Sequence, residues 1–350
     1  MVTVAAAGLL FAACAAAAPT LLDSRAEDIL AASLLQTRDL PIDPQTAEAI
    51  AQQAERGFLD GLFNNKYTNG PAFDVSATSG EWAQWAHYQA AVYCGPQKFN
   101  NWQCGANCDA VGPNNVVVGS GGDNEANPWW YVVDRGDTLV IAITGTNTQS
   151  PLSIGVDLNF LLVPPDPALF PGAAGVLVHA GFHDAFRRMA PGLTAAVRKG
   201  LAAATPGTRR RVTVLGHSLG GAIGHLVAVY LARLLGDQAD VYARVFASPR
   251  VGNPAWANYV DATLGDRAQH IVNFNDPVPH LPPKDWGWRQ SSNEVWIPQI
   301  GSPELRLCSG QENTKCSDSL NFGFALITSL IKYMDADVHS GPYAGVRLKC

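Results

Sequence analysis

The chain has 350 residues, of which 47% are hydrophobic, and its formal net charge is −6 at pH 7. A chain of this size and composition can bury a large core, and we expect one large α/β domain with extensions rather than two domains. The densest positive patch is the short run Arg209–Arg211, so the charge distribution argues against nucleic acid as a partner.

The N-terminal segment predicts export from the cell. Residues 2–18 are small and apolar, and the alanines before Pro19 offer several A-x-A cleavage sites, which is typical of a secretory signal peptide. Because the segment begins without Lys or Arg, a buried helix or a membrane anchor is the alternative. We assign residues 1–18 to the signal peptide, 19–80 to an N-terminal extension or propeptide, and 81–350 to the main domain. No other apolar run reaches the ~20 residues of a transmembrane helix.

Six cysteines remain once the predicted signal peptide, which contains Cys14, is removed. They are Cys94, Cys104, Cys108, Cys308, Cys316 and Cys350. An even number of cysteines in an exported chain predicts three disulfides, and six cysteines allow fifteen pairings. A zinc site is the alternative, but the pair Cys104 and Cys108 has no second close pair of ligands nearby, so we predict no metal site.

Short apolar runs and helical patterns alternate along the main domain. Thr78-Ser79-Gly80-Glu81 has the pattern of a capping box, and the helix after it should turn Trp82, Ala86, Ala90 and Tyr93 toward a core. A second helix is expected after Gly181, with Pro191-Gly192 kinking or splitting it. Strands are expected at Val116–Val118, Trp129–Val133, Leu139–Ile143, Val212–Leu215, Val241–Ala247 and Gln269–Phe274. This alternation predicts a mostly parallel central sheet with helices on both faces.

The residues from Arg210 to Leu235 have the pattern strand, tight turn, helix. At the turn, Gly216-His217-Ser218-Leu219-Gly220 fits the G-x-S-x-G motif of a nucleophile elbow. The two glycines remove side chains that would clash across the turn, and the helix N-terminus presents backbone N–H groups that favour an oxyanion. We therefore predict Ser218 as a nucleophile; the alternative is a glycine-rich helix start without chemistry.

A nucleophilic serine needs a base, which is usually a histidine oriented by a carboxylate. In α/β-hydrolases the order along the chain is Ser, then Asp or Glu, then His. Asp276 follows the expected strand that ends at Phe274, whereas Asp261 and Asp266 lie on or beside an expected surface helix. Of the two later histidines, His280 is too close to Asp276 to bridge it to Ser218. We therefore predict Asp276 and His339 as the partners of Ser218, and we interpret His217 as a packing or hydrogen-bonding residue.

Two further features complete the predicted site. The oxyanion should be held by the backbone N–H of Leu219 and by Thr146, which follows a strand end and offers a hydroxyl as well. Residues 148–164 are strongly apolar between two prolines, which favours a mobile amphipathic lid, with an ordinary buried helix or strand as the alternative. The lid residues singled out are Pro151, Leu152, Ile154 and Val156.

With these residues in place, the chain resembles the fungal secreted triacylglycerol lipases of the class 3 lipase family. The matching segments are Tyr93-Cys94, Ile143-Thr144-Gly145-Thr146, Val178-His179-Ala180-Gly181-Phe182, Val214-Leu215-Gly216-His217-Ser218-Leu219-Gly220-Gly221, Ser248-Pro249-Arg250-Val251-Gly252-Asn253, Asn275-Asp276-Pro277-Val278-Pro279 and Asp337-Val338-His339. The resemblance implies an α/β-hydrolase-like fold, the triad Ser218, Asp276 and His339, an oxyanion hole from Thr146 and Leu219, and a lid at about 148–158. It also implies the disulfides Cys94–Cys350, Cys104–Cys108 and Cys308–Cys316.

The resemblance implies a secreted, extracellular lipase that hydrolyses acylglycerols through an acyl-enzyme at a lipid–water interface. We expect a monomer with no cofactor and no metal, and we expect residues 81–350 to form the lipase domain. Two departures concern the lid and chain-length preference: Ile143-Thr144 stand where the family often has Phe-Arg, and the lid lacks a tryptophan. The alternatives are a feruloyl or other carboxylesterase on the same fold and a catalytically inactive binding module.

Overall fold

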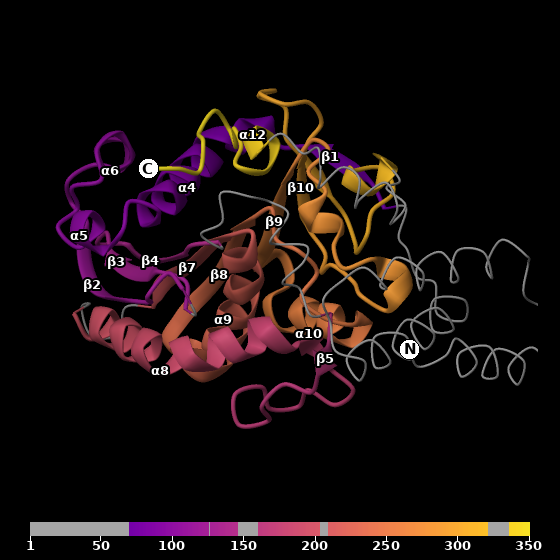
Figure 1. The fold of residues 1–350 in the computed structure, drawn as a ribbon, viewed down its shortest axis with the longest axis horizontal. Coiled ribbons are helices and arrows are strands. Elements are labelled where there is room, and N and C mark those ends of the chain that lie inside the picture. The colour runs from indigo at the N-terminus through magenta and orange to yellow at the C-terminus, as the bar shows by residue number, and fades with distance from the viewer. Residues whose placement is uncertain (1–69, 126, 146–159, 204–208, 321–335) are drawn as a thin grey trace, which may run out of the picture. The chain divides into compact units, whose positions relative to one another are not determined.

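The structure, a computed structural model, describes residues 70–125, 127–145, 160–203, 209–320 and 336–350. Within these ranges the chain forms a nine-stranded sheet in the order β1-β11-β10-β9-β8-β7-β4-β3-β2 (Figure 1). Its strands are β1 (Ala72–Asp74), β2 (Val116–Gly121), β3 (Trp130–Asp134), β4 (Thr138–Ile143), β7 (Arg210–His217), β8 (Ala239–Phe246), β9 (Ala268–Asn273), β10 (Glu294–Ile297) and β11 (Arg306–Cys308). β5 (Leu162–Val163) and β6 (Val178–His179) form a separate antiparallel pair.

The sheet is mixed. Its central strands β4, β7, β8, β9 and β10 pair in parallel, whereas β2 and β3 at one edge and β1 and β11 at the other pair antiparallel. The predicted α/β class is confirmed, and the sheet is parallel only at its centre. The reason is the length of the connections: residues 135–137 join β3 to β4 directly, and such a short link allows only antiparallel pairing.

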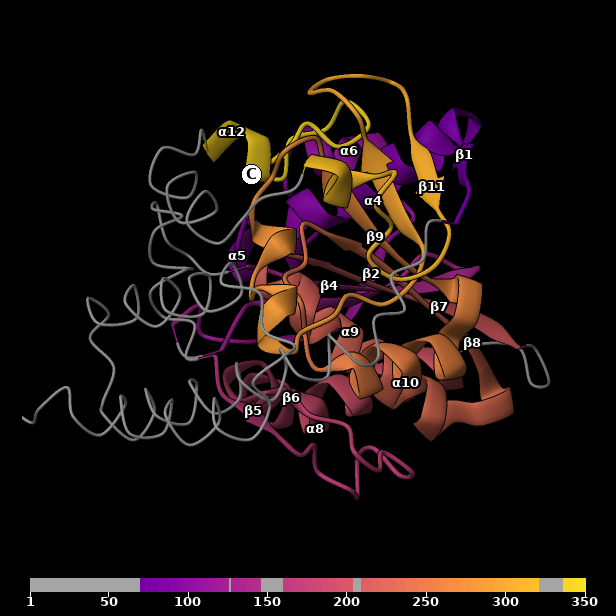
Figure 2. The same cartoon turned by 90° about the vertical axis from the view of Figure 1, so that its right-hand side faces the viewer.

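Helices cover both faces of the sheet, as predicted. The helices are α4 (Ser79–Val92), α5 (Pro96–Phe99), α6 (Ala106–Val111), α8 (Ala180–Ala202), α9 (Leu219–Leu235), α10 (Pro254–Leu264) and α12 (Ala336–His339). On one face α4 packs over β4 and β7, and on the other α8 packs over β2 and β3 while α9 packs over β7 and β8 (Figures 1 and 2).

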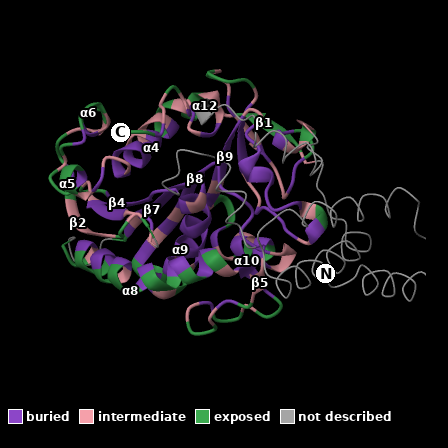
Figure 3. Cartoon of the chain, in the orientation of Figure 1, coloured by how far each residue is buried: buried purple, intermediate pink, exposed green. Residues whose placement is uncertain are grey.

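The central strands are buried on both faces, which explains why apolar and β-branched residues dominate β4 and the middle of β7 (Figure 3). On β4, Val140 and Ala142 belong to the same core cluster as Trp82 of α4. Leu139 faces the other way, because a Cβ added to Gly200 of α8 would lie 2.7 Å from its side chain. Each strand therefore contributes alternate residues to two separate apolar layers.

Two local predictions differ from the structure. The capping box at Thr78 is wrong: the Thr78 hydroxyl donates to the Val75 carbonyl at 2.8 Å and caps nothing, because the chain enters α4 from a single turn of 3-10 helix over Ser76–Thr78. The split at Pro191 is also wrong, since α8 runs from Ala180 to Ala202 without a break. Pro191 is exposed, so the backbone bond that it cannot make is lost on the solvent side.

The sheet begins before the predicted domain boundary at residue 80. β1 pairs with β11, with Ala72 opposite Cys308, so this strand belongs to the same sheet as the centre of the fold. The predicted signal peptide and most of the predicted extension, residues 1–69, lie outside the described residues, and the division at residues 18, 80 and 81 stays a prediction.

One helical stretch among the described residues, Leu219–Gln238, is long and apolar enough to cross a membrane by length and composition alone. It comprises α9 and the turn after it, and α9 packs against the central strands β7 and β8. In its most apolar window, 67% is buried within the fold. This placement is that of a core helix.

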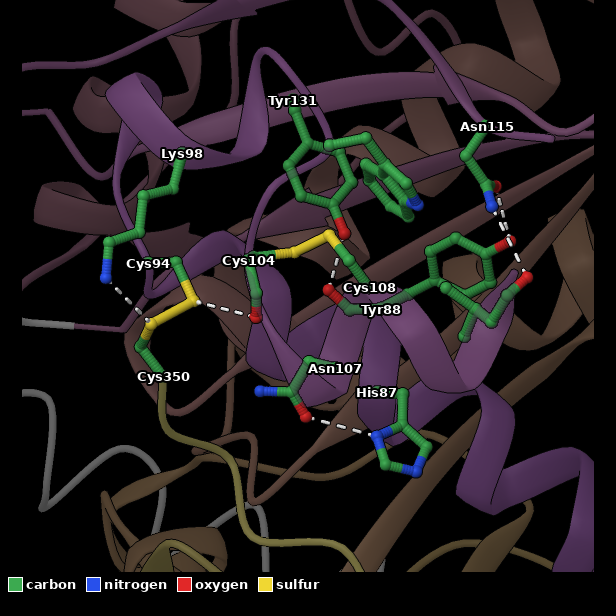
Figure 4. Close-up of a disulfide and its surroundings, with 12 residues drawn as sticks. His87, Tyr88, Cys94, Lys98, Cys104, Asn107, Cys108, Asn115, Tyr131 and Cys350 are labelled. Carbon is green, nitrogen blue, oxygen red and sulfur yellow. Dashed lines mark hydrogen bonds between the residues drawn. A yellow bond between two sulfur atoms is a disulfide. The ribbon is translucent and has the colours of Figure 1, made fainter. Parts of the chain in front are cut away.

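Three disulfides join Cys94 to Cys350, Cys104 to Cys108 and Cys308 to Cys316. They are the pairs that the resemblance implied. Cys94 directly follows the C-cap of α4, so the first disulfide ties that helix to the C-terminal residue across a separation of 256 residues (Figure 4). Nearby, the Asn107 side chain of α6 donates to the Lys349 carbonyl at 3.0 Å, which holds the same C-terminal segment.

Loss of the long-range disulfide should destabilise the fold far more than loss of the short-range one. By loop entropy, Cys94→Ala/Cys350→Ala should lower the free energy of unfolding by about 5–6 kcal/mol, and Cys104→Ala/Cys108→Ala by about 2 kcal/mol. Denaturant unfolding of both double variants and the parent, followed by tryptophan fluorescence, measures the two losses. Equal losses would show that loop length does not govern the contribution of Cys94–Cys350.

Candidate active site

Ser218 occupies the sharp turn between β7 and α9, with a backbone φ of +57° and ψ of −127°. Few residues other than glycine adopt such angles, which cost of order 1–3 kcal/mol and cluster at functional sites. The turn depends on both glycines of the motif. A Cβ at Gly216 would lie 2.0 Å from the Gly220 carbonyl oxygen, and one at Gly220 would lie 2.4 Å from the carbonyl oxygens of Ile143 and Thr144. The local structure predicted for the nucleophile elbow is therefore present.

Asp276 and His339 are brought together from positions 63 residues apart in the chain. Asp276 lies beyond the C-terminal end of β9 and is 0% exposed, and its Oδ2 accepts a hydrogen bond from His339 Nδ1 at 2.8 Å. Its Oδ1 accepts from the Val278 backbone N–H at 3.0 Å. A carboxylate can only accept, so Nδ1 of His339 carries the hydrogen and Nε2 presents a lone pair in the neutral imidazole.

The backbone around His339 is fixed by neighbouring elements. The Asn273 side chain at the end of β9 donates to the Val338 carbonyl at 2.8 Å, and the Tyr343 hydroxyl donates to the His339 carbonyl at 3.0 Å. The same strand therefore positions both the acid and the segment that carries the histidine.

Two side-chain atoms of this site are buried without a hydrogen-bond partner among the described residues: Ser218 Oγ and His339 Nε2. Ser218 is 2% exposed and His339 is 5% exposed. Leaving a buried polar atom unpaired is unfavourable by about 1–3 kcal/mol, and such atoms concentrate where chemistry needs them. A hydroxyl donor and an imidazole acceptor left in this state are the pair that proton transfer from a serine requires.

His217, the residue before Ser218, has hydrogen bonds at both ring nitrogens. Nδ1 lies 2.7 Å from the Tyr93 hydroxyl, and Nε2 lies 2.9 Å from the His339 carbonyl oxygen. Burial, and then the charge that His339 can acquire, hold the pKa of His217 well below its usual range, so its imidazole is neutral. These bonds agree with our interpretation of His217 as a hydrogen-bonding residue.

The predicted oxyanion hole is described in part. Leu219 is the first residue of α9, where backbone N–H groups have no carbonyl one turn earlier to bond. Thr146 and the lid residues Pro151, Leu152, Ile154 and Val156 lie outside the described residues. The neighbour of Thr146, Gly145, passes close to the elbow: a Cβ there would lie 3.1 Å from that of Ser218.

A single substitution separates the hydroxyl of Thr146 from its backbone. Thr146→Val should lower kcat on a soluble ester by about 10²–10³, the usual effect of losing one oxyanion donor, with little change in KM. Thr146→Ser keeps the hydroxyl and is the matched control. Normal turnover of Thr146→Val would restrict the role of residue 146 to its backbone N–H.

Comparison with known proteins places this geometry in a family. The model of the family "Lipase (class 3)" matches residues 140–286, which contain the elbow and Asp276. Lipase II from Rhizopus niveus shares the fold with a TM-score of 0.67 and 26% identity, covering 79% of this chain and 98% of that one. Residues 140–286 thus match the class 3 lipase family, and the fold is similar to that of fungal lipases.

Other relatives of this chain carry more specific names. A secreted mono- and diacylglycerol lipase of Malassezia globosa is 39% identical over 179 residues, which are 50% of this chain and 57% of the relative. The chain thus matches little more than half the length of that relative. A structure of the Rhizomucor miehei triacylglyceride lipase has 29% identity and a TM-score of 0.61, covering 74% of this chain and 96% of the neighbour.

The loop after Asp276 is held by a buried ion pair that the sequence did not reveal. The Arg250 guanidinium forms two bonds of 2.7 Å with Glu312 and also donates to the carbonyls of His280 and Pro282. Burial alone would raise the pKa of Glu312, but the charge and hydrogen bonds of Arg250 outweigh it and lower that pKa to about 2. A buried ion pair of this kind fixes the loop, because breaking it would leave a buried charge without a partner, which is energetically unfavourable.

Three further buried histidines lie outside the catalytic group. Burial lowers the pKa of His179 and His225 to about 3 and that of His270 to about 4, so all three are neutral. His280, the rejected alternative for the base, is also buried, with its pKa lowered to about 4. In the described ranges, no group of three or more His, Cys, Asp or Glu side chains is arranged to hold a metal ion.

Proposed function

We propose that this chain is a secreted serine carboxylic-ester hydrolase that cleaves acylglycerols through an acyl-enzyme. One observation carries the proposal. Buried Asp276 accepts a hydrogen bond from Nδ1 of His339 at 2.8 Å, so Nε2 of His339 carries a lone pair and can act as a base. The hydroxyl of Ser218 is buried and has no hydrogen-bond partner among the described residues. A serine hydroxyl becomes a nucleophile only when such a base takes its proton.

The reaction follows from these three side chains. Ser218 Oγ attacks the ester carbonyl carbon as His339 Nε2 takes the hydroxyl proton, and Asp276 stabilises the imidazolium without becoming protonated. The carbonyl oxygen becomes an oxyanion held by the N–H of Leu219 and by Thr146. When the intermediate collapses, the C–O bond to the alcohol breaks and the alcohol leaves with the proton from Nε2. Water then enters, gives a proton to Nε2, and releases the fatty acid from Ser218 by the same steps.

The substrate class is supported by the relatives and by the sequence. Two of the relatives described above are named a mono- and diacylglycerol lipase and a triacylglyceride lipase, so an acylglycerol is the common substrate in their names. Residues 148–164 supply a strongly apolar segment next to the oxyanion residue Thr146 in the chain, which suits a lid over a lipid-binding site at a lipid–water interface. Secretion is supported by the N-terminal sequence and by the names of the relatives. We propose that the enzyme acts as a monomer without a cofactor.

A panel of esters tests this function. The purified chain should release fatty acid from emulsified mono-, di- or triacylglycerol, and Ser218→Ala, measured in parallel, should not. A rate that rises sharply as the substrate passes from solution to emulsion would support a lid that opens at an interface. Hydrolysis of soluble or feruloyl esters without any turnover of acylglycerols would replace the lipase with a carboxylesterase. No ester turnover at all would favour an inactive binding module.

A further inference from the structure

A chain of hydrogen bonds runs beneath the site and connects four segments that are distant in sequence. The Gly145 backbone N–H, after β4, donates to the Tyr93 hydroxyl at 2.8 Å. That hydroxyl lies 2.7 Å from His217 Nδ1, and His217 Nε2 lies 2.9 Å from the carbonyl oxygen of His339. This chain of hydrogen bonds thus begins at Gly145, the residue before Thr146, and ends at the carbonyl of the predicted base His339.

The direction of every bond in this chain is fixed by chemistry. The His339 carbonyl can only accept, so Nε2 of His217 must carry the hydrogen. In a neutral imidazole the other nitrogen, Nδ1, is then an acceptor, and Tyr93 donates its hydroxyl hydrogen to it. The hydroxyl oxygen of Tyr93 in turn accepts from the Gly145 N–H. Burial, and then the charge of His339, lower the pKa of His217, while burial raises the pKa of Tyr93, so both groups stay neutral.

The two ends of the chain lie where small displacements matter. At one end, Gly145 packs closely against the elbow: a Cβ added there would lie 2.9 Å from the His217 carbonyl oxygen and 3.0 Å from the Tyr93 hydroxyl. At the other end, the rings of His217 and His339 are 4.6 Å apart between centroids. His339 is therefore held at its ring by Asp276 and at its carbonyl by His217 and Tyr343.

We propose that His217 and Tyr93 are positioning residues that hold the base His339 and the backbone of Gly145, the residue before the predicted oxyanion donor, in a fixed relation to Ser218. The inference rests on the proposed ester hydrolysis. Neither side chain needs to touch the substrate: the hydroxyl of Tyr93 sets the position of the Gly145 backbone, and the Nε2–H of His217 sets that of the His339 backbone. Misplacement of a catalytic group by about 1 Å can cost about 10²-fold in rate, so the loss of either bond should appear in kcat.

The test compares variants on the hydrolysis of p-nitrophenyl butyrate, a soluble ester that does not depend on an interface. Tyr93→Phe removes one hydroxyl and should lower kcat by about 10- to 100-fold, with KM changed less than about threefold. Tyr88→Phe is the matched control, because Tyr88 is a buried tyrosine of α4, the helix that Tyr93 caps, and its hydroxyl donates at 2.6 Å to Asn115. Both variants should lower the melting temperature, and only Tyr93→Phe should lower kcat.

Variants at His217 test the other half of the chain and remain informative if Tyr93→Phe fails to fold. His217→Leu should lower kcat by about 10- to 100-fold, whereas His217→Gln, which retains one donor and one acceptor, should recover most of that loss. The double variant Tyr93→Phe/His217→Leu should lose no more activity than the worse single variant, because both substitutions interrupt the same chain of hydrogen bonds.

The outcomes separate the two claims. If the parent enzyme is active and Tyr93→Phe, His217→Leu and Tyr88→Phe lose activity only in parallel with their melting temperatures, the positioning role is wrong and the proposed function stands. A rise in KM without a fall in kcat would also overturn the positioning role. If the parent and Ser218→Ala hydrolyse the ester at the same rate, the proposed function itself is wrong, and the positioning role falls with it.

Discussion

Replacing Ser218 with alanine should lower kcat for ester hydrolysis by up to about 10⁶, close to the full contribution of a catalytic triad. The change removes the one oxygen that bonds to the acyl carbon, and it leaves His339 Nε2 with no hydroxyl to deprotonate. The elbow itself should survive, because alanine has a Cβ like serine and can be held at the same backbone angles by Gly216 and Gly220. Initial rates on p-nitrophenyl butyrate and on emulsified triacylglycerol measure the loss.

A second buried serine provides the matched control. Ser248 is 1% exposed, and its hydroxyl donates to the Pro249 carbonyl at 3.0 Å and lies 3.5 Å from Nδ1 of His225, so it too neighbours a histidine. Ser248→Ala should keep kcat within a few-fold of the parent. If Ser218→Ala retained more than about 1% of the parent rate, the nucleophile would have to be another residue.

Asp276→Asn should lower kcat by about 10⁴ while leaving the protein folded. The amide oxygen can still accept from the Val278 N–H, but the amide nitrogen then faces His339 Nδ1 and donates to it. Because a neutral imidazole that accepts at Nδ1 carries its hydrogen on Nε2, His339 can no longer take the proton of Ser218. Steady-state kinetics with circular dichroism as the folding control measure this effect.

Asp261 is the natural comparison, since it is one of the two acids, with Asp266, that are alternatives to Asp276 in the sequence. Its carboxylate accepts from the backbone and hydroxyl of Ser292 at 2.9 and 2.7 Å, and Gln311 donates to it at 2.7 Å. Asp261→Asn should change kcat less than threefold. Equal losses in the two variants would mean that Asp276 acts through stability rather than through the tautomer of His339.

The centre of the fold could be predicted because its signals are local. β4, β7, β8 and β9 are largely buried and each contains apolar, mostly β-branched residues, and the strands fall within two residues of the predicted ones. Ser218 could be placed because the strand, the two glycines and the helix that define the elbow are adjacent in sequence. The same reasoning missed the edge strand β1, because Ala72–Asp74 is short, exposed and fixed only by pairing with β11, more than 230 residues later.

The hydrogen bonds that support the site could not be predicted for a related reason. His217 binds Tyr93, 124 residues away, and the His339 carbonyl, 122 residues away, and no local pattern links these positions. Arg250 and Glu312 are separated by 62 residues, and their pairing is visible only once both are buried together. Motif order was enough to predict that Asp276 and His339 are partners, whereas the tautomer of His339 follows only from the 2.8 Å contact at Nδ1.

Covalent labelling with diethyl p-nitrophenyl phosphate tests the central claim most directly. The reagent phosphorylates only a serine activated by a neighbouring base, and trypsin should release the modified residue in the peptide Val212–Arg233, in which Ser218 is the only serine. We predict one equivalent of label in this peptide, with ester hydrolysis lost in proportion to labelling, and no label in Asp276→Asn over the same time. Label on another residue, or full activity with Ser218 completely labelled, would contradict the assignment of Ser218 as the nucleophile.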